Sequence, residues 1–416
     1  MNEYKTRTRC AVCDNKNLHT IMEYGNVPLA GDFLDKEGLK NDKKYNLNIQ
    51  FCEKCSLLQT DSIVDADVLF EDYRYMSSIG LSNHFSDVAK NIKSKFNPKN
   101  VLEIGSNDGV LLKPLMDLGI DAVGVDPAVN ICEIAESKGC NVYNEYFNEE
   151  FVGKFEFENR FDFVISNNCF AHIDDIQSIV KGVKKTLKED GYFQIEVHYV
   201  KPLIEKLQYD NIYHEHLYYY SLTALYNLFK KYDMTVVDFE EIPIHAGSIR
   251  VLVKNSQEKL NKKVSGRLYL ERDDWEITSL EYFTSFGKKV NQHIEVIKET
   301  LEDLKSQDMK IVGYGASGRA TMLCNLAGIT TDMVDYIVDE SPERIDRYIA
   351  GTHVPIVSKE HLDNDNEKPD YIFIFAWNFS KMIIEKLNGR GYRYIVAFPE
   401  MQIVDSHLEL KNFVGV

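Results

Sequence analysis

The segment at residues 208–221 concentrates side chains that can move protons. Two histidines, two carboxylates and five tyrosines occur in it: His214, His216, Asp210, Glu215, Tyr209, Tyr213, Tyr218, Tyr219 and Tyr220. A histidine or tyrosine beside a carboxylate can act as a general base, because the carboxylate fixes the imidazole tautomer and stabilises its protonated form. We therefore expect proton-transfer chemistry here, with a hydrogen-bonded surface turn as the alternative. A metal site on His214 and His216 is disfavoured, because the sequence offers no evident further ligands.

Four of the eight cysteines form two pairs with metal-ligand spacing, and the other four are scattered singly. The pairs are Cys10 with Cys13 and Cys52 with Cys55, with 38 residues between them. Each Cys-x-x-Cys turn lets two thiolates converge on one ion, and two turns supply the four sulfur ligands of a tetrahedral structural Zn²⁺. We expect such a zinc site, because two unrelated pairs of buried cysteines are the weaker alternative. Four sulfur ligands leave no open position for a substrate, so the metal should hold the fold together.

A first glycine-rich turn, Gly105-Ser106-Asn107-Asp108-Gly109, follows Glu103, and Asp126 ends the next expected strand. Glycines let a ligand approach the backbone, and a carboxylate after the second strand can accept both hydroxyls of a ribose. The acids and the amide suit a zwitterionic amino-acid tail and would repel a pyrophosphate. The turn resembles the S-adenosylmethionine site of class I methyltransferases, and a purely structural turn is the alternative.

A second glycine-rich turn, Gly313-Tyr314-Gly315-Ala316-Ser317-Gly318, is followed by Asp339 at the end of the next expected strand. By pattern alone it is a dinucleotide fingerprint. The same backbone amides at a helix N-terminus would hold the pyrophosphate of a nucleotide sugar equally well, and Arg319 adds a positive charge. The residues alone are compatible with NAD, with a sugar nucleotide and with a packing turn.

Short apolar runs alternate with helical stretches, which predicts an α/β fold with parallel sheets covered by helices on both faces. Strands are expected at residues 101–104, 122–125, 141–143, 161–165 and 192–197, and again at 309–314, 334–338, 371–375 and 394–398. The carboxyl ends of parallel strands converge on the ligand crevice, so Asn167 and His172 after the fourth strand should open into it. The charged, helix-like residues 256–307 should connect two domains. Residues 73–78 are either packing or a lid, and a lid is slightly favoured.

Length and charge bound the class of protein. A chain of 416 residues should form two or three domains, and 44% hydrophobic with 27% charged residues excludes a disordered or fibrous protein. The net charge of −17 is opposite in sign to what neutralising DNA or RNA requires. Neither a signal peptide nor an apolar span of membrane length is evident. We therefore expect a cytoplasmic protein that binds neither nucleic acid nor a membrane. The sequence does not determine the oligomeric state, and a monomer is slightly favoured.

The order of these motifs resembles that of the sugar C-methyltransferases of deoxysugar biosynthesis, which act at C3 of nucleotide-linked 4-keto-6-deoxysugars. The resemblance runs nearly end to end. It rests on the paired Cys-x-x-Cys turns and on residues 73–78, 103–109, 213–221, 313–318, 351–356 and 376–378.

The resemblance implies three modules. These are a small zinc-binding domain at residues 1–75, a class I methyltransferase Rossmann-like domain at 76–255, and a second Rossmann-like domain with a helical connector at 256–416. S-adenosylmethionine would be the methyl donor, and the second turn would face the nucleotide of the sugar substrate. The implied cofactor contacts are Glu103, Gly105, Asn107, Asp108, Gly109, Asp126 and Asn167. The implied substrate contacts are Tyr75, His214, Gly315, Arg319 and Asn378.

The resemblance also implies a mechanism. A ketone at C4 acidifies the proton on C3, and its removal gives an enolate whose carbon attacks the sulfonium methyl group. His216 is the expected base, oriented by Glu215, although Tyr213 could take that role. Tyr213 and His172 would stabilise the enolate oxygen or share the proton, and Tyr75 would close over the crevice.

Two positions near the expected substrate depart from the family pattern. His198 stands where a proline is usual after the fifth strand, and Arg319 ends a turn where a lysine and small residues are commoner. The resemblance therefore predicts the reaction of this protein better than it predicts which sugar is the substrate. An NAD-dependent nucleotide-sugar oxidoreductase is the alternative enzyme, but it leaves the first glycine turn unexplained. A non-enzymatic zinc module is disfavoured by the acidic charge and the intact 213–216 run.

Overall fold

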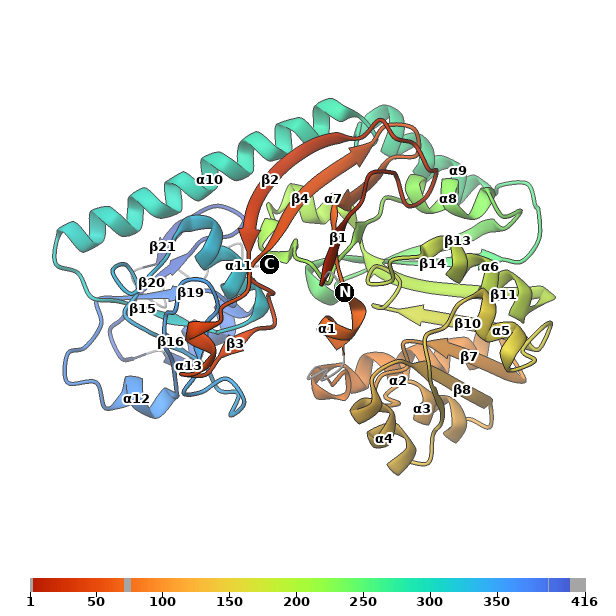
Figure 1. Cartoon of the computed structure of the whole chain (residues 1–416), viewed down its shortest axis with the longest axis horizontal. Helices are drawn as coiled ribbons and strands as arrows, with labels where there is room; N and C mark the ends of the chain where they lie inside the picture. Colours follow the sequence, from red (N-terminus) through yellow and green to blue (C-terminus); the bar gives the residue numbers. More distant parts are fainter. Residues whose placement is uncertain (1–2, 71–75, 388, 405–416) are drawn as a thin grey trace. The chain divides into compact units, whose positions relative to one another are not determined.

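The computed structural model describes residues 3–70, 76–387 and 389–404, which fold as two compact units (Figure 1). Unit 1 is built from Met1–His19, Gln50–Val200 and Leu217–Leu280. Unit 2 is built from Thr20–Ile49, Lys201–His216 and Glu281–Val416. The units are thus interleaved along the chain, and each draws on more than one of the modules expected from the sequence. Tyr75 lies outside the described residues.

A seven-stranded sheet with the order β13-β14-β11-β10-β7-β8-β9 lies at the centre of unit 1. The strands are β7 (Asn100–Ile104), β8 (Asp121–Asp126), β9 (Asn141–Asn144), β10 (Phe161–Asn167), β11 (Leu187–His198), β13 (Thr235–Ile242) and β14 (Ser248–Lys254). β14 pairs antiparallel with both its neighbours, and the other pairs are parallel. The five expected parallel strands are confirmed, whereas the hairpin of β13 and β14 was not predicted.

Helices cover both faces of this sheet, as the sequence predicts. They are α2 (Ser78–Phe96), α3 (Leu112–Asp117), α4 (Val129–Ser137), α5 (Glu149–Lys154), α6 (Ile176–Thr186), α8 (Leu222–Lys230) and α9 (Lys262–Tyr269). Alternate strand residues face opposite layers. Val101 packs with the cluster of α2 and α3, and its neighbour Leu102 packs with the cluster that contains Val183 of α6 and Phe229 of α8. Burial on both faces explains the continuous apolar runs of these strands.

The cysteine-rich residues of unit 1 form small paired strands beside this domain. β1 (Tyr4–Thr6) pairs antiparallel with β6 (Ser62–Val64), and β5 (Leu57–Thr60) pairs antiparallel with β12 (Tyr218–Tyr219). A short helix, α1 (Ala66–Phe70), follows β6. Arg7 ties the N-terminal strand to the loop after β10, because its guanidinium donates to Asp174 at 2.6 Å and to the Tyr218 hydroxyl at 2.9 Å.

A six-stranded sheet with the order β18-β16-β15-β19-β20-β21 forms the core of unit 2, and β21 is its antiparallel edge. Its strands are β15 (Ile311–Tyr314), β16 (Ile337–Val338), β18 (Ile356–Val357), β19 (Tyr371–Ile374), β20 (Arg393–Val396) and β21 (Gln402–Val404). The unit's helices are α10 (Leu280–Ser306), α11 (Gly318–Ala327), α12 (Lys359–Asp363) and α13 (Ser380–Leu387), and α7 (Val200–Glu205) begins at the unit boundary. The expected connector thus contains α9 in unit 1 and the 27-residue α10.

Unit 2 also contains an N-terminal excursion of the chain. β2 (His19–Val27) leads into it, β3 (Phe33–Leu34) pairs antiparallel with β17 (Tyr348–Ile349), and β4 (Tyr45–Cys52) leads out. The Asp42 carboxylate accepts from the Gly351 backbone N–H at 2.6 Å and contacts His353 Nε2 at 2.9 Å. These contacts give the Gly-Thr-His-Val-Pro-Ile motif a structural role.

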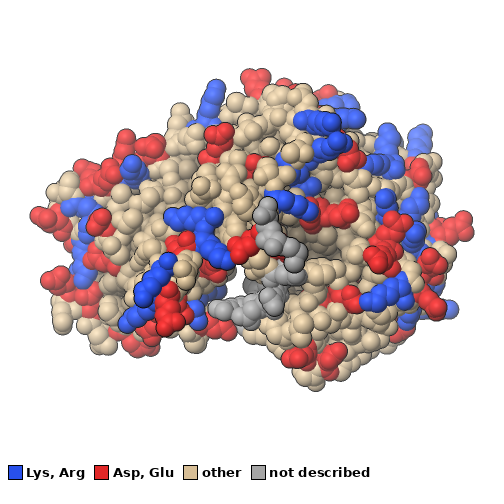
Figure 2. Space-filling model, viewed as in Figure 1, with Lys and Arg blue, Asp and Glu red and all other residues tan. Residues whose placement is uncertain are grey.

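The surface carries both signs of charge. On the face in Figure 2, Lys and Arg side chains are interspersed with Asp and Glu side chains. Among the described helices, none has both the length and the apolar character that crossing a membrane requires.

Candidate active site

A cavity of about 510 Å³ opens in unit 1 at the carboxyl ends of β7, β8 and β10, where α/β sheets bind ligands. Four of the expected cofactor residues line it: Gly105, Asn107, Asp126 and Asn167. His172 lines it as well. The structure therefore brings the first glycine turn and the residues after the fourth parallel strand to one site.

Asp126 holds the first glycine turn in place. One of its carboxylate oxygens accepts from the Asn107 N–H at 2.9 Å, and the other accepts from the Ala128 N–H at 3.0 Å. Burial raises the pKa of Asp126, and the two backbone donors lower it. Gly105 has φ +72°, and a Cβ there would lie 2.4 Å from the Cys169 sulfur, so only glycine fits.

Three polar atoms behind the turn lack a hydrogen-bond partner among the described residues. They are Glu103 Oε2, Asp108 Oδ1 and Asn167 Nδ2, each nearly shielded from solvent. Burial, then the charges of Asp126 and Asp108, raises the pKa of Glu103 well above its usual range. Glu103, Asp108 and Gly109 are not among the residues that line the cavity. Of the three residues only Asn167 lines the cavity, so its Nδ2 fits a bound polar ligand such as the amino-acid part of S-adenosylmethionine.

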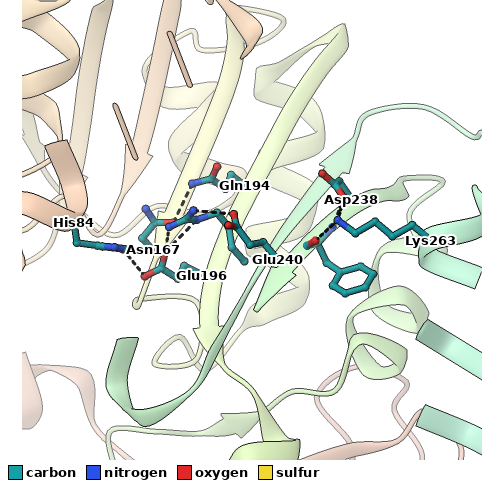
Figure 3. A network of polar contacts seen from close by, with 9 residues as sticks. His84, Asn167, Gln194, Glu196, Asp238, Glu240 and Lys263 are labelled. Atoms are coloured by element: carbon teal, nitrogen blue, oxygen red, sulfur yellow. Dashed lines mark hydrogen bonds and ion pairs between the residues drawn. The ribbon is translucent and has the colours of Figure 1, made fainter. Parts of the chain in front are cut away.

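Glu196 near the end of β11 is a buried charged residue that the sequence analysis did not single out (Figure 3). Its fully buried carboxylate contacts His84 Nε2 at 3.0 Å and accepts from Arg250 at 2.8 Å and from Asn168 at 3.1 Å. Burial would raise the pKa of Glu196, but the His84 hydrogen bond and the Arg250 charge outweigh it and lower the pKa. Asn168 lines the cavity, so the network braces its wall. The sequence signal that could have indicated this network is a glutamate within an otherwise buried strand.

His172 is half-buried on the loop after β10, and its backbone N–H donates to the Cys169 carbonyl at 2.8 Å. Burial, then the nearby His245, lowers the pKa of His172 to about 4. His172 is therefore a neutral imidazole near pH 7, able to donate a hydrogen bond without carrying charge.

The four paired cysteines meet in unit 1. The sulfur atoms of Cys10, Cys13, Cys52 and Cys55 all lie within 4.8 Å of one another. The Cys10–Cys55 and Cys13–Cys52 sulfur distances are 3.3 and 3.6 Å. Thiolates about 2.3 Å from one tetrahedral Zn²⁺ require separations of this order, so the donor set fits a structural zinc ion.

The Tyr-His-Glu-His run belongs to unit 2, separately from His172 in unit 1. His216 is buried, and its Nδ1 lies 2.9 Å from the Asn211 carbonyl oxygen. A carbonyl can only accept, so Nδ1 carries the proton and Nε2 carries the lone pair in the neutral ring. The ring of Tyr213 lies against that of His216, with 4.1 Å between centroids.

Glu215 and His214, which lie between Tyr213 and His216 in the chain, have different surroundings. Glu215 faces the N-terminal excursion, where a Cβ on Gly31 would lie 3.6 Å from its carboxylate. Burial, then the charge of Asp32, raises the pKa of Glu215 to about 7. His214 is buried and donates from Nε2 towards the Tyr45 and Asn46 carbonyls, both at 3.3 Å, so it holds β4.

The second glycine turn in unit 2 leads into α11. Gly315 has φ +93°, and a Cβ there would lie 2.5 Å from that of Ala376. Asp339 accepts from the Ala316 N–H at 2.7 Å and from the Ser341 N–H at 2.8 Å, the same arrangement that Asp126 makes with the first turn. Both turns thus present backbone amides beside a strand-end carboxylate.

An aromatic and charged cluster adjoins this turn. The Arg319 guanidinium lies 4.8 Å above the Trp377 ring and donates to Gln208 at 3.3 Å. Trp377 Nε1 donates to the buried Asp210 carboxylate at 2.7 Å. Asn378 is half-buried next to Trp377. Gly315, Arg319 and Asn378 lie in one unit with residues 213–216, whereas the sequence analysis placed residues 213–216 in a different module from these three.

Three family models match the chain in order. They are described as "Putative zinc binding domain" at residues 10–70, "Methyltransferase domain" at 71–238 and "C-methyltransferase C-terminal domain" at 243–399. These matches agree with the four-cysteine cluster and with the sheet order of unit 1, so the expected class I methyltransferase fold with a zinc-binding N-terminal domain is confirmed.

One curated relative matches almost the whole chain. It is the C-methyltransferase NovU from Streptomyces niveus, 29% identical over 96% of this chain and 98% of that protein. A ubiquinone biosynthesis O-methyltransferase from Bartonella bacilliformis is 28% identical over 22% of this chain and 38% of its own length. Among solved structures, the magnesium protoporphyrin IX methyltransferase of Synechocystis PCC 6803 with bound S-adenosylmethionine covers 43% of this chain and 81% of its own, with 12% identity and a TM-score of 0.34.

Proposed function

We propose that this chain, an S-adenosylmethionine-dependent C-methyltransferase with a structural zinc site, methylates a nucleotide-linked 4-keto-6-deoxysugar at C3. Similarity to a C-methyltransferase over nearly the full length supports carbon as the methyl acceptor. The order of the motifs supports the sugar nucleotide as the substrate class.

The observation that carries the proposal is the hydrogen bond from His216 Nδ1 to the Asn211 carbonyl. It fixes the neutral tautomer whose Nε2 can accept a proton, which is the state that a general base needs. The carbonyl thus serves the orienting role that we expected of Glu215. Glu215, whose pKa burial raises to about 7, is a further group of the same run that can exchange a proton near neutral pH.

The reaction divides into a proton transfer and a carbon–carbon bond formation. His216 takes the proton from the carbon next to the ketone, and the electron pair of the C–H bond passes into the enolate. Tyr213, whose ring lies against that of His216, and neutral His172 are the proposed donors to the enolate oxygen. When bound, S-adenosylmethionine supplies an electrophilic methyl group for the enolate carbon.

The residues of unit 1 bind and orient the methyl donor. Asp126 would accept from ribose hydroxyls beside the turn that it holds, and the unsatisfied Asn167 Nδ2 would donate to the carboxylate of the amino-acid tail. Gly105, where a Cβ would meet Cys169, lets the turn keep its conformation beside the cavity.

The second glycine turn is the proposed site for the nucleotide of the substrate. Its amides lead into the N-terminus of α11, and Arg319 provides the positive charge that a diphosphate requires. An NAD-dependent oxidoreductase would use the same turn, but none of the three matching family models describes such an enzyme.

Incubation with S-adenosylmethionine and a panel of 4-keto-6-deoxysugar nucleotides tests the proposal. We expect S-adenosylhomocysteine and a sugar nucleotide heavier by one CH₂ group. Turnover of none of the panel, with S-adenosylmethionine bound to the protein, would contradict the substrate class. Nicotinamide-dependent oxidation of the same sugars would contradict the methyl transfer.

A further inference from the structure

A histidine at one end of the unit 1 cavity lies on a loop with an unusual backbone. Residues 243–247 join β13 to β14, and the pair of Ile242 with Ser248 closes the loop. His245 and Ala246 have φ values of +53° and +64°. Residues with a Cβ enter this left-handed region only at a cost, because the Cβ crowds the backbone.

The loop holds this conformation with several hydrogen bonds. The Gly247 N–H and the Ser248 hydroxyl both donate to the Ile244 carbonyl, at 3.0 and 2.9 Å. The Tyr199 N–H donates to the Gly247 carbonyl at 3.2 Å. Hairpin loops normally place Gly, Asn or Asp where φ is positive. Strained residues held by their surroundings concentrate at functional sites, so the histidine at this position requires an explanation.

The position of His245 provides that explanation. His245 lines the same cavity as Gly105, Asp126 and His172. Its ring centroid lies 5.5 Å from that of His198 at the end of β11. His245 is also close enough to His172 to contribute to that residue's lowered pKa. Two histidines from different segments, His172 and His245, thus line one cavity, and His198 lies against His245.

We propose that His245 is a further catalytic residue, which donates a ring N–H to the ketone oxygen of the methyl acceptor. This inference rests on the proposed function. Removal of the carbon-bound proton moves an electron pair onto that oxygen, where a hydrogen-bond donor stabilises the developing charge. The enolate carbon then bonds to the methyl group, which leaves the carbon–sulfur electron pair on sulfur and re-forms the ketone. His245 gains and loses no proton over the cycle.

Two substitutions at His245 separate catalysis from loop structure. His245→Asn introduces a residue that tolerates positive φ, and His245→Gly removes the strain altogether. Ala246→Gly is the matched control, because it relieves neighbouring strain without touching an imidazole. We measure kcat and KM with the accepted sugar nucleotide, S-adenosylmethionine affinity by calorimetry, and thermal unfolding.

Both His245 variants should fold and bind S-adenosylmethionine like the parent but lose about 10²-fold in kcat, while Ala246→Gly keeps the parent kcat. A merely structural residue would change unfolding without changing kcat in the folded protein. Parent-like kcat in His245→Gly overturns the assignment and leaves the proposed function intact. Loss of S-adenosylmethionine binding in both His245 variants overturns the acceptor role. A parent that turns over no keto-sugar nucleotide overturns the proposed function and the His245 role together.

Discussion

The Nδ1–H group of His216 donates a 2.9 Å hydrogen bond to the carbonyl oxygen of Asn211, five residues earlier in the chain. A backbone carbonyl holds the imidazole tautomer at any pH at which the ring is neutral, because it does not titrate. Nε2 is therefore the ring nitrogen that can take a proton.

Replacing His216 with Asn should lower kcat by about 10²-fold or more, because the general base is lost. KM for the sugar nucleotide should change less than kcat. His361→Gln is the control, since His361 is an exposed histidine of α12 in the same unit. Parent kcat in the His216→Asn variant would show that His216 is not the base. Tyr213 would then be the candidate base, and the Tyr213→Phe variant should lose kcat.

Zinc removal should weaken S-adenosylmethionine binding as well as stability. Tyr4, Lys5, Ile63 and Leu69, from the strands and helix beside the cysteine cluster, line the unit 1 cavity. Elemental analysis should find about one zinc per chain, and Cys52→Ser should reduce both zinc content and affinity for S-adenosylmethionine. Cys324→Ala, a buried cysteine of α11, should keep both. A zinc-free Cys52→Ser protein with parent affinity would show that the metal does not support the cavity.

Gly105 and Gly119 offer a matched pair, because their φ values are +72° and +75°. An added Cβ at Gly119 meets nothing within 4 Å, whereas one at Gly105 meets the Cys169 sulfur at 2.4 Å. Gly119→Ala should cost about 1–2 kcal/mol of unfolding free energy from backbone strain. Gly105→Ala should cost about 1–3 kcal/mol more from overpacking, and should also weaken S-adenosylmethionine binding. Urea unfolding and calorimetry provide the two readouts, and equal effects at both positions would refute the packing argument.

Glu196 and Glu240 both contact Arg250, at 2.8 and 3.4 Å, but Glu196 is fully buried and Glu240 is 62% exposed at the side chain. Glu196→Gln should lower the unfolding free energy by about 3 kcal/mol, because it leaves Arg250 and His84 without their buried partner. Glu240→Gln should cost less than about 1 kcal/mol, because that pair lies in water. Equal losses from the two substitutions would contradict the network.

The lowered pKa of Glu196 also sets the direction of a pH effect. A carboxyl whose pKa is lower in the folded state contributes stability above its unfolded pKa and loses it as pH falls through the folded pKa. The difference in unfolding free energy between parent and Glu196→Gln should therefore be largest near neutral pH and shrink below the ordinary glutamate pKa.

The sequence predicted the elements that local patterns encode. The strand at Val101–Ile104 is mainly apolar because both its faces are buried, and the Cys-x-x-Cys spacing predicted the four cysteines that meet. The hairpin of β13 and β14 was not predicted, because the alternation of strands and helices indicates parallel pairing.

Long-range relationships were not accessible from the sequence. His84 contacts the Glu196 carboxylate although the two residues are 112 positions apart in the sequence, and no local pattern predicts that contact. A motif of side chains suggested Glu215 as the group that orients His216, whereas the hydrogen-bonded acceptor is a backbone carbonyl. The left-handed conformation of His245 is likewise a property of the closed hairpin loop.

The fate of the transferred methyl carbon tests the central claim most directly. The parent enzyme is incubated with S-adenosylmethionine labelled with ¹³C in its methyl group and a 4-keto-6-deoxysugar nucleotide, and the product is analysed by NMR. The account predicts a ¹³C methyl group bonded to C3, next to the ketone, with S-adenosylhomocysteine formed in equal amount. Label attached to oxygen, or no labelled sugar from any nucleotide tested, would contradict it.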